Sequence, residues 1–530
     1  MKKNQWYVLA LFASLFTVNS YAQNVAINED GSLPNANAML DVKSSTKGLL
    51  IPRVSTTGRL AIPNTKGLLV YDTTANSFWY NTGTGWENMA AASSGAGWSL
   101  TGNSGTTSSN FLGTTDSKPL IIKVGNVHSG RIEGSVHNNT FLGFNTAPVT
   151  TGRENTATGA FTLFANTEGH NNTVNGAYAL SSNTIGFNNT AIGSSSMERT
   201  TTGYNNVGIG VYSLSQNTTG ADNTASGTQA LQFNSTGSVN TATGLWAMHD
   251  NTTGANNAAH GGYSMIANTV GVYNTSSGAY SLFTNTTGGY NTATGGEASK
   301  FNLDGTGNTG TGYRALYNNR SGHWNTSAGA YSMTGNVTGG ANTTLGAFTD
   351  VVNGATNATA IGYSAFSNVS NKVRIGNSAV TVIEGQVPFT TPSDGRYKYQ
   401  VKEDVKGLDF IMQLRPVTYQ FDVKRFDAAQ RKDQKENDMI AASNIMQASY
   451  NEAAAIRRTG FIAQEVEKAA SVSGYNFSGV IKPKTAEEHY SLSYESFVVP
   501  LVKAVQEQQK IIIDLQNQIN ELKKSQQRSK

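Results

Sequence analysis

A glycine returns at every 17th residue through the middle of this 530-residue chain, and no other feature limits the possible folds as strongly. The series runs without a break through positions 159, 176, 193, 210, 227, 244, 261, 278, 295, 312, 329 and 346. A second glycine series from 152 to 339 and an asparagine series from 155 to 342 keep the same spacing. A disordered tract keeps its composition but loses its register, so the fixed period predicts a repeat fold.

Each repeat has the residue pattern of a compact β-coil. An aromatic, a small and an aliphatic position follow one another, as at 161–163 (Phe-Thr-Leu) and 178–180 (Tyr-Ala-Leu). Aromatic and aliphatic side chains two residues apart predict a strand with one buried face. The glycines would form corners, where φ is positive or backbones approach closely, and the asparagines would stack as turn ladders. We expect a mainly β fold: a parallel β-roll or β-helix solenoid over residues 141–366, with two short strands in each coil.

Low charge and the absence of cysteine narrow the functional classes. Only 14% of residues are charged, the formal net charge is +4, and the chain has no cysteine. A near-neutral chain is a poor electrostatic partner for nucleic acid or anionic lipid, so we expect no nucleic-acid partner. Lack of cysteine excludes a disulfide framework, a thiol nucleophile and an iron–sulfur cluster. The seven histidines have no ligand spacing and no P-loop occurs, so we predict neither a metal site nor a cofactor.

The N-terminus has the pattern of an export signal. Two lysines precede a short apolar run over residues 6–18, and small residues at the −3 and −1 positions mark a cleavage site after Ala22. We expect a signal peptide over residues 1–22, cut between Ala22 and Gln23. The protein would then be extracellular or at the cell surface, without a transmembrane anchor. The alternative is an uncleaved N-terminal anchor.

Residues 23–92 are predicted to form a separate β-rich module. Short β-type runs such as Gly67–Asp72 and Phe78–Asn81 alternate with Gly, Asn and Thr turn signals. The succession resembles the N-terminal segment of exported proteins that carry tail-fibre-like domains. Residues 93–140 begin with a Ser-, Gly- and Thr-rich stretch, so we expect a linker and then the strands that lead into the solenoid.

The repeats resemble the heads of trimeric autotransporter adhesins and the shafts of phage tail fibres. This resemblance implies three chains side by side, so the first expected partner is the chain itself, as a homotrimer. A column of aromatic residues that includes Tyr178, Trp246 and Tyr331 allows two interpretations. One is structural packing at solenoid spacing. The other is a surface that binds a surface glycan or a cell-surface receptor.

Composition changes abruptly after residues 367–392, which we expect to form closing strands. From Ser393 onward the chain holds more than half of its charged residues, so a different, α+β domain is predicted there. Four motifs follow in order: residues 391–398 (TPSDGRYK), 407–419 (GLDFIMQLRPVTY), 460–466 (GFIAQEV) and 490–507 (YSLSYESFVVPLVKAVQE).

This set of motifs resembles the endosialidase-type intramolecular chaperone, the self-cleaving C-terminal domain of phage tail spikes, over residues 393–500. The resemblance implies a domain that assembles the upstream β-structure as a trimer. It also implies one cut of the chain immediately before a serine, with a lysine five residues later as its partner. Those positions are held by Ser393, as nucleophile, and Lys398, as base, so the cut would fall between Pro392 and Ser393.

The serine and lysine set a geometric condition. Five extended residues span about 16 Å, whereas proton transfer needs about 3 Å. Either the Asp394-Gly395 turn signal folds Lys398 back, or another subunit supplies the lysine. The plain alternative is an ordinary turn with a surface charge. The sequence departs from the family pattern at Tyr397, where leucine is usual, and in the polar stretch 427–458, which looks like an insertion.

A heptad pattern closes the sequence over residues 501–524. Apolar residues and one glutamine alternate in steps of four and three: Leu501, Val505, Gln508, Ile512, Leu515, Ile519 and Leu522. This is the period of a coiled coil. The pattern does not choose between two and three strands, and a single amphipathic helix docked on its own domain is the alternative.

These features predict an exported fibrous surface protein of tail-fibre or adhesin type, built as a homotrimer by a chaperone domain that cuts itself off. By resemblance the chain is a self-directed, single-turnover serine-type endopeptidase. One alternative is a polysaccharide-degrading tail-spike enzyme with the same chaperone, although glycoside hydrolysis needs two placed carboxylates and the repeats hold few. Another alternative is an adhesin that keeps its chaperone domain uncleaved.

Overall fold

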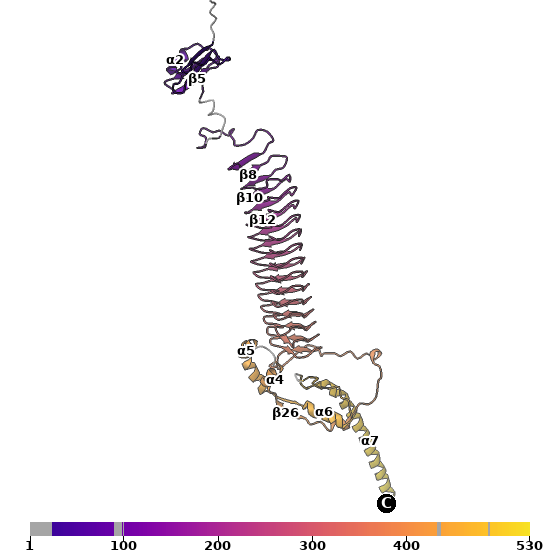
Figure 1. Cartoon of the computed structure of the whole chain (residues 1–530). Helices are drawn as coiled ribbons and strands as arrows, with labels where there is room; N and C mark the ends of the chain where they lie inside the picture. Colours follow the sequence, from indigo (N-terminus) through magenta and orange to yellow (C-terminus); the bar gives the residue numbers. More distant parts are fainter. Residues whose placement is uncertain (1–23, 90–97, 99, 432–435, 486–487, 530) are drawn as a thin grey trace, which may run out of the picture. The chain divides into compact units, whose positions relative to one another are not determined.

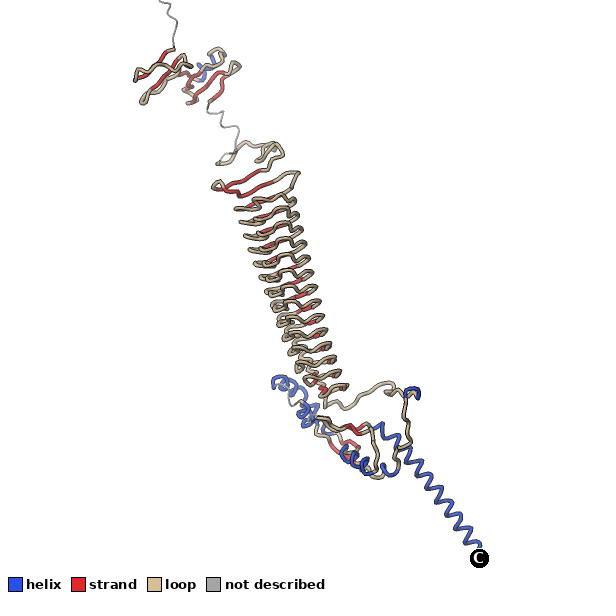
Figure 2. The backbone as a smooth tube through the Cα atoms, turned by 45° about the vertical axis from the view of Figure 1, so that its right-hand side comes forward, coloured by secondary structure: helices blue, strands red, loops and turns tan. Residues whose placement is uncertain are grey.

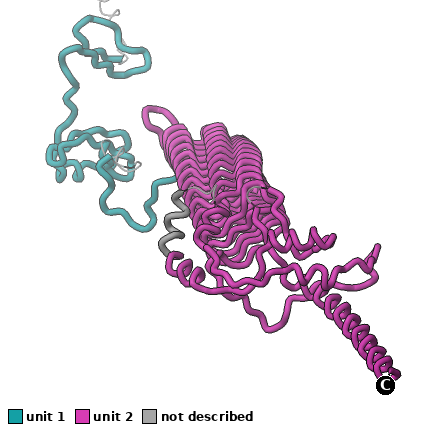
Figure 3. Tube along the Cα trace, turned by 90° about the horizontal axis from the view of Figure 1, so that it is seen from below, with its two compact units in different colours: residues 1–113 teal, residues 114–530 magenta. Residues whose placement is uncertain are grey.

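The computed structural model describes residues 24–89, 98, 100–431, 436–485 and 488–529. The chain divides into two compact units, residues 1–113 and residues 114–530 (Figure 3). The predicted signal peptide and its cleavage site, between Ala22 and Gln23, lie outside the described residues.

The first unit is β-rich, as its turn signals predict. Strands β1 (Val25–Asn28) and β2 (Leu40–Lys43) pair in parallel. A four-stranded sheet follows in the order β3 (Arg53–Val54), β4 (Leu69–Asp72), β5 (Ser77–Asn81) and β6 (Trp86–Asn88). A short helix, α2 (Thr56–Ala61), carries Arg59, which forms a buried ion pair with Asp72 at 2.9 Å and lies 3.6 Å above the ring of Trp79. Both charged side chains are buried, but their attraction for each other offsets part of the free-energy cost of removing the two charges from water.

The second unit begins with a hairpin and continues as a long parallel ladder. The hairpin consists of β7 (Leu120–Val124) and β8 (Val127–Ile132), and β8 pairs with β9 (Thr140–Leu142). From β9 onward each strand pairs in parallel with the strand of the next coil, and the coils stack along one axis (Figures 1 and 2). The ladder strands after β9 are β10 (Thr156–Thr158), β11 (Thr173–Asn175), β12 (Thr190–Ile192), β13 (Val207–Ile209), β14 (Thr224–Ser226), β15 (Thr241–Thr243), β16 (Ala258–His260), β17 (Thr275–Ser277), β18 (Thr292–Thr294), β19 (Thr309–Thr311), β20 (Thr326–Ala328), β21 (Thr343–Leu345), β23 (Thr359–Ile361) and β25 (Val373–Ile375). The prediction of a parallel β-solenoid with a 17-residue spacing is confirmed.

The solenoid core is made of identical rows, one residue from each coil. The aliphatic row, which includes Leu180, Met197 and Leu214, is completely buried. A neighbouring row of small residues, such as Ala179 and Ser196, is equally buried. Because each coil repeats the last, every buried side chain rests on its counterparts above and below, and the core needs no disulfides.

The asparagine series forms the buried ladder that its register predicts. In each coil the side-chain oxygen accepts the backbone N–H of the next asparagine, as Asn206 Oδ1 does from Asn223 at 3.1 Å. The amide nitrogen donates to a glycine carbonyl, as Asn223 Nδ2 does to Gly237 at 2.9 Å. A second buried asparagine row, which includes Asn234 and Asn251, donates to the same carbonyls. The first asparagine row is thereby paired from coil to coil, as burial requires, whereas in the second row Asn183 Oδ1 has no partner among the described residues because the next position is Thr200.

The two glycine series serve the two purposes expected of corners. In the series of Gly261, φ lies at +131°, a region essentially reserved for glycine. In the series of Gly254, a Cβ atom would lie 2.6 Å from the Gly271 carbonyl oxygen of the next coil. Glycine is therefore needed in the first series because of its backbone conformation, and in the second series because the neighbouring coil leaves no room for a side chain.

The prediction of two strands in each coil is wrong for the repeats of β10 to β20, each of which forms one three-residue strand. The repeats of β21 and β23 each add a two-residue strand, β22 (Asp350–Val351) and β24 (Phe366–Ser367). The aromatic–small–aliphatic segment is a turn, because its first and third residues adopt positive φ, as Tyr178 (59°) and Leu180 (50°) do. The turn directs the small Ala179 and the aliphatic Leu180 into the core, whereas Tyr178 remains 47% exposed. A strand would have buried the aromatic and aliphatic residues together on one face.

In residues 367–392, for which the sequence predicts closing strands, the structure has strands in the first part. Beside the ladder, β22 (Asp350–Val351) pairs with β24 (Phe366–Ser367), and β25 (Val373–Ile375) ends the ladder. The segment 383–387 (IEGQV) forms no strand and is exposed. Among the described residues it pairs with no strand, so the β-propensity of its two terminal residues is not realised.

The remaining residues form an α+β domain next to the last coils (Figures 1 and 2). Its elements are, in order, η2 (Gly395–Tyr397), α3 (Leu408–Ile411), β26 (Val417–Gln420), α4 (Val423–Gln430), α5 (Glu436–Ala455), β27 (Arg457–Gly460), α6 (Ala463–Val472), β28 (Val480–Ile481), β29 (Ser491–Leu492), η3 (Tyr494–Phe497) and α7 (Val498–Arg528). Two antiparallel pairs, β26–β27 and β28–β29, are its only sheets among the described residues. The fold class is thus mainly β, followed by a helical C-terminal region.

Candidate functional site

The structure brings Ser393 and Lys398 together. The side chain of Asp394 caps the short helix η2 by accepting the backbone N–H of Arg396 at 2.9 Å. This turn folds the chain back, so that Lys398 Nζ lies 2.7 Å from Ser393 Oγ, within hydrogen-bond distance. Of the two routes that the sequence left open, the single chain adopts the local turn.

The pair lies in an exposed segment. Every residue from 380 to 404 is exposed, and Tyr397, next to the lysine, is 81% exposed. Arg396 donates from Nε (2.9 Å) and Nη2 (2.5 Å) to one oxygen of Asp394, which lowers the pKa of that carboxyl. A lysine becomes a general base when burial or nearby positive charge favours its neutral form. The single chain supplies the hydrogen bond but not the burial.

Three of the four C-terminal motifs meet in one core. Phe410 (second motif) and Phe497 (fourth) pack against Phe477 with ring centroids 4.9 and 4.7 Å away. Phe461 (third) stacks on Phe497 at 5.3 Å. Gly407 lies so close to α7 that an added Cβ would be 2.7 Å from the Ala504 backbone nitrogen. This core explains the spacing of those motifs, and the first motif, with Ser393, stands outside it.

Helix α7 presents an unpaired apolar stripe. The expected heptad positions Leu501, Ile512, Leu515, Ile519 and Leu522 are between 46% and 63% exposed on this single 31-residue helix. Only the N-terminal part of α7 contacts its own domain, through Leu408 N–H, which donates to Glu507 at 2.8 Å. An exposed apolar stripe of this kind is typical of an interaction surface.

One face of the solenoid carries no formal charge. The outward-pointing residues of strands β9 to β21 and β23 include no Asp, Glu, Lys or Arg and are mostly threonine. We call these residues the strand face. The charged residues of the same coils all lie at other positions: Arg153, Glu154, Glu168, Glu198, Arg199, Asp222, Asp250, Glu297, Lys300, Asp304, Arg314, Arg320, Asp350 and Lys372. Depletion of charge is typical of the centre of a protein–protein interface.

Threonines on and off the strand face differ in their hydrogen bonds. In the corner row, hydroxyls donate to the next coil, as Thr218 does to Ser235 O at 2.9 Å and Thr252 to Thr269 O at 2.9 Å. Strand-face hydroxyls such as those of Thr224 and Thr241 make no hydrogen bond within the described chain. They remain available to a partner or to water.

The rings of the aromatic column stack on one another. Tyr263 and Tyr280 stack with centroids 5.0 Å apart and planes 1° apart, and Tyr331 and Phe348 stack at 5.1 Å and 5°. Ring faces that lie against one another are not free for a sugar ring, so the stacking favours the structural interpretation of this column.

Some residues were missed by sequence reasoning. The second asparagine row shares the 17-residue period and could have been found from it. Asp427 and Arg431, which join the helical domain to the last coils, lie in the polar insertion, where neither spacing nor a motif marks them. Within the described ranges, no cluster of three His, Cys, Asp or Glu side chains could hold a metal ion, and no helix there is both long and apolar enough to cross a membrane.

Together these parts define a fibrous β-solenoid protein with an exposed serine–lysine pair before a compact C-terminal domain. Two family matches agree with that class. Residues 26–108 match the family described as phage tail like trimerisation region, and residues 393–475 match the peptidase family described as chaperone of endosialidase. A search of the curated proteins found no match to this chain. The chain therefore combines a region similar to the phage tail like trimerisation family, a β-solenoid and a region similar to the endosialidase chaperone family, and these together support a tail-fibre-type protein.

Proposed function

We propose that this chain is an exported tail-fibre- or adhesin-type surface protein whose C-terminal domain directs homotrimer assembly and then cuts the chain once, before Ser393. The observation that carries the proposal is the 2.7 Å contact between Ser393 Oγ and Lys398 Nζ at the first residue of the region similar to the endosialidase chaperone. The N-terminal match to a trimerisation region supports the homotrimer.

The cut would proceed through an ester. Lys398, in its neutral form, accepts the Ser393 hydroxyl proton while Ser393 Oγ attacks the carbonyl carbon of Pro392. The Pro392–Ser393 C–N bond breaks as the nitrogen takes up a proton, which leaves Pro392 esterified to Ser393 Oγ. Water then hydrolyses the ester, giving a carboxylate on Pro392 and a free α-amine and hydroxyl on Ser393. The reaction consumes one water and no cofactor.

Assembly would switch the reaction on. Because Lys398 is exposed in the single chain, it gains a low-dielectric environment when neighbouring chains cover the segment. The α7 stripe would pair with its two counterparts as a coiled coil over residues 501–524. Cleavage would therefore follow folding and trimer formation.

The strand face is the solenoid surface best suited to the threefold contact. Three residues at about 3.3 Å each and some fourteen coils at about 4.8 Å give a face of roughly 670 Å². This area is close to the 800 Å² or so that a standard interface buries on each partner. Export, through the signal peptide proposed over residues 1–22, would place the trimer outside the cell or at its surface.

Denaturing electrophoresis with N-terminal sequencing tests the cut. The purified full chain is expected to give a C-terminal fragment whose first residue is Ser393, and the Ser393→Ala variant is expected to remain whole. Ser370→Ala, a change of an exposed serine upstream, should be cut like the parent. An intact parent chain with a folded solenoid, or a fragment that persists in Ser393→Ala, would contradict the proposal.

A charge on the strand face should weaken the trimer. Thr224→Glu places three carboxylates at the contact, where they repel one another and lose water. We expect a lower trimer fraction by sedimentation and a lower denaturant midpoint. Thr236→Glu is the matched control, because Thr236 is an exposed threonine of the same coil on a face that carries charges. Equal behaviour of the two variants would exclude the strand face as the interface.

A further inference from the structure

A buried polar network joins the C-terminal domain to the end of the solenoid. Arg431 Nε pairs with Asp427 Oδ2 at 3.0 Å, and Tyr450 OH donates to the same oxygen at 2.8 Å. Across the junction, Ser378 Oγ donates to Asp427 Oδ1 at 2.9 Å, and Arg431 Nη2 donates to the carbonyl oxygen of Ser364. These five residues are called the junction network below.

The residues of the junction network lie on both sides of the proposed cut in the sequence, and none of them is at the cut. Ser364 and Ser378 lie upstream of the Pro392–Ser393 bond, and the other three residues lie downstream, in or next to α4 and α5. Cleavage at residue 393 would therefore leave every one of these hydrogen bonds in place.

The network is well protected from water. The side chains of Arg431 and Asp427 are 7% and 13% exposed, and the guanidinium also lies 5.7 Å from the ring centre of Phe366, in the last coils. Burial and the hydrogen bond to Asp427 raise the pKa of Tyr450, which keeps its hydroxyl a donor. Buried charges of this kind are strongly coupled, because removing one partner leaves the other uncompensated.

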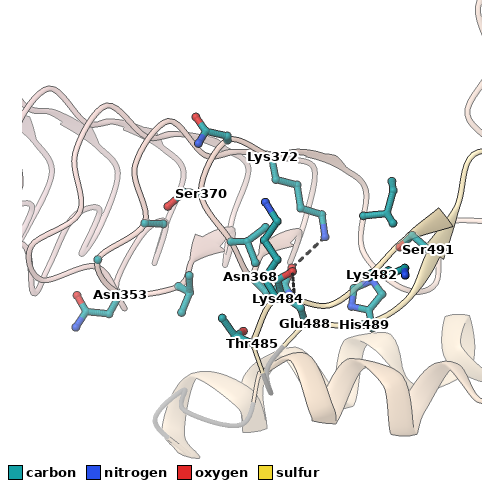
Figure 4. A pocket seen from close by; sticks show the side chains of 16 residues that line it. Asn353, Asn368, Ser370, Lys372, Lys482, Lys484, Thr485, Glu488, His489 and Ser491 are labelled. Atoms are coloured by element: carbon teal, nitrogen blue, oxygen red, sulfur yellow. Dashed lines mark hydrogen bonds between the residues drawn. The ribbon is translucent and has the colours of Figure 1, made fainter. Parts of the chain in front are cut away.

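Elsewhere the same junction is open. A cavity of about 830 Å³ separates the last coils, at Asn368 and Lys372, from the β28–β29 side of the domain, at Lys484 and His489 (Figure 4). Lys372 Nζ bonds Asn368 of its own solenoid at 3.0 Å rather than reaching across. The α4–α5 insertion, not the β28–β29 side, is thus where the two parts are closely packed.

We propose that the junction network retains the C-terminal domain on the solenoid after the chain is cut. The binding partner of the α4–α5 surface is the solenoid end of the other cleavage product. Before the cut, the chain itself holds the two surfaces at high effective concentration. Afterwards they are held by the network and by the contacts beside it, such as that of Asn377 Nδ2 with Met446 Sδ at 3.3 Å. The cleavage step rests on the proposed function, whereas the retention does not.

A cut made by an added protease separates the two questions. In a Ser393→Ala full-length chain, a recognition site for a sequence-specific protease is placed in the exposed segment 383–390. After complete cutting, size-exclusion chromatography should show both fragments together. With Asp427→Ala the fragments should separate about 100-fold more readily, since a buried charge loses its partner. With Ser378→Ala, which removes one hydrogen bond, the effect should be about tenfold.

Two controls keep the result decisive. Arg425→Ala changes an exposed side chain of α4 and should behave like the parent. Ser378 lies outside the C-terminal domain, so its effect cannot come from misfolding of that domain. Prompt separation of the parent fragments, or retention that Asp427→Ala and Ser378→Ala leave unchanged, would overturn the proposal. Failure of self-cleavage would not affect this experiment.

Discussion

Replacing Gly261 by alanine is expected to destabilise the solenoid by about 3 to 5 kcal/mol. Gly261 has φ at +131°, and an added Cβ would lie 2.8 Å from the carbonyl carbon and oxygen of Gly278 in the next coil. The alanine would meet an unfavourable backbone conformation and a backbone clash together. Chemical denaturation followed by circular dichroism should show the loss as a lower midpoint.

The adjacent glycine provides the control. At Gly262 an added Cβ has one neighbour, Leu245 O, at 3.9 Å, which is ordinary contact distance. Gly262→Ala should be neutral or stabilise by up to about 1 kcal/mol, because alanine restricts the unfolded chain. If both substitutions had the same effect, the tight stacking of the Gly261 series would be refuted.

The second large effect is expected at Lys398. Lys398→Arg keeps the positive charge and the reach toward Ser393 Oγ, but a guanidinium is not deprotonated in proteins and cannot act as the base. Self-cleavage should slow by about 10³-fold or more, while the trimer still assembles. The measurement is the rate at which the Ser393 fragment appears, together with the sedimentation coefficient of the uncut chain.

A purely structural role for the lysine would give another result. If Lys398 served only to hold the turn, Lys398→Arg would retain cleavage and Lys398→Met would lose it. Lys402→Arg, a change at an exposed lysine nearby, should leave the rate unchanged. Normal cleavage by Lys398→Arg would remove Lys398 from the role of base.

The periodic part of the fold could be predicted because each repeat has glycine and asparagine at the same positions. The Gly261 series and the asparagine ladder keep their register, and both were confirmed. The course of the chain within a coil could not be predicted as well. Tyr178 and Leu180 adopt positive φ, which neither residue type favours, so the local pattern indicated a strand where packing imposes a turn.

The C-terminal region divides in the same way. Motif order predicted the endosialidase chaperone region, and the Asp394-Gly395 turn signal gave a route that the structure adopts for Lys398. The contact between Asp427 and Ser378 joins residues 49 positions apart through an insertion without periodicity. Such long-range contacts depend on tertiary packing, which no local pattern records.

The coil lengths themselves have a consequence for how such a protein can change. Successive ladder strands start 17 residues apart from β10 to β21, then 16 and 14 residues apart to β23 and β25. The irregular coils are confined to the ends, so a whole 17-residue unit can be gained or lost in the middle without disturbing either end. Each such event would alter the reach of the fibre by about 4.8 Å, which makes the length of the rod a trait that duplication and deletion can tune in equal steps.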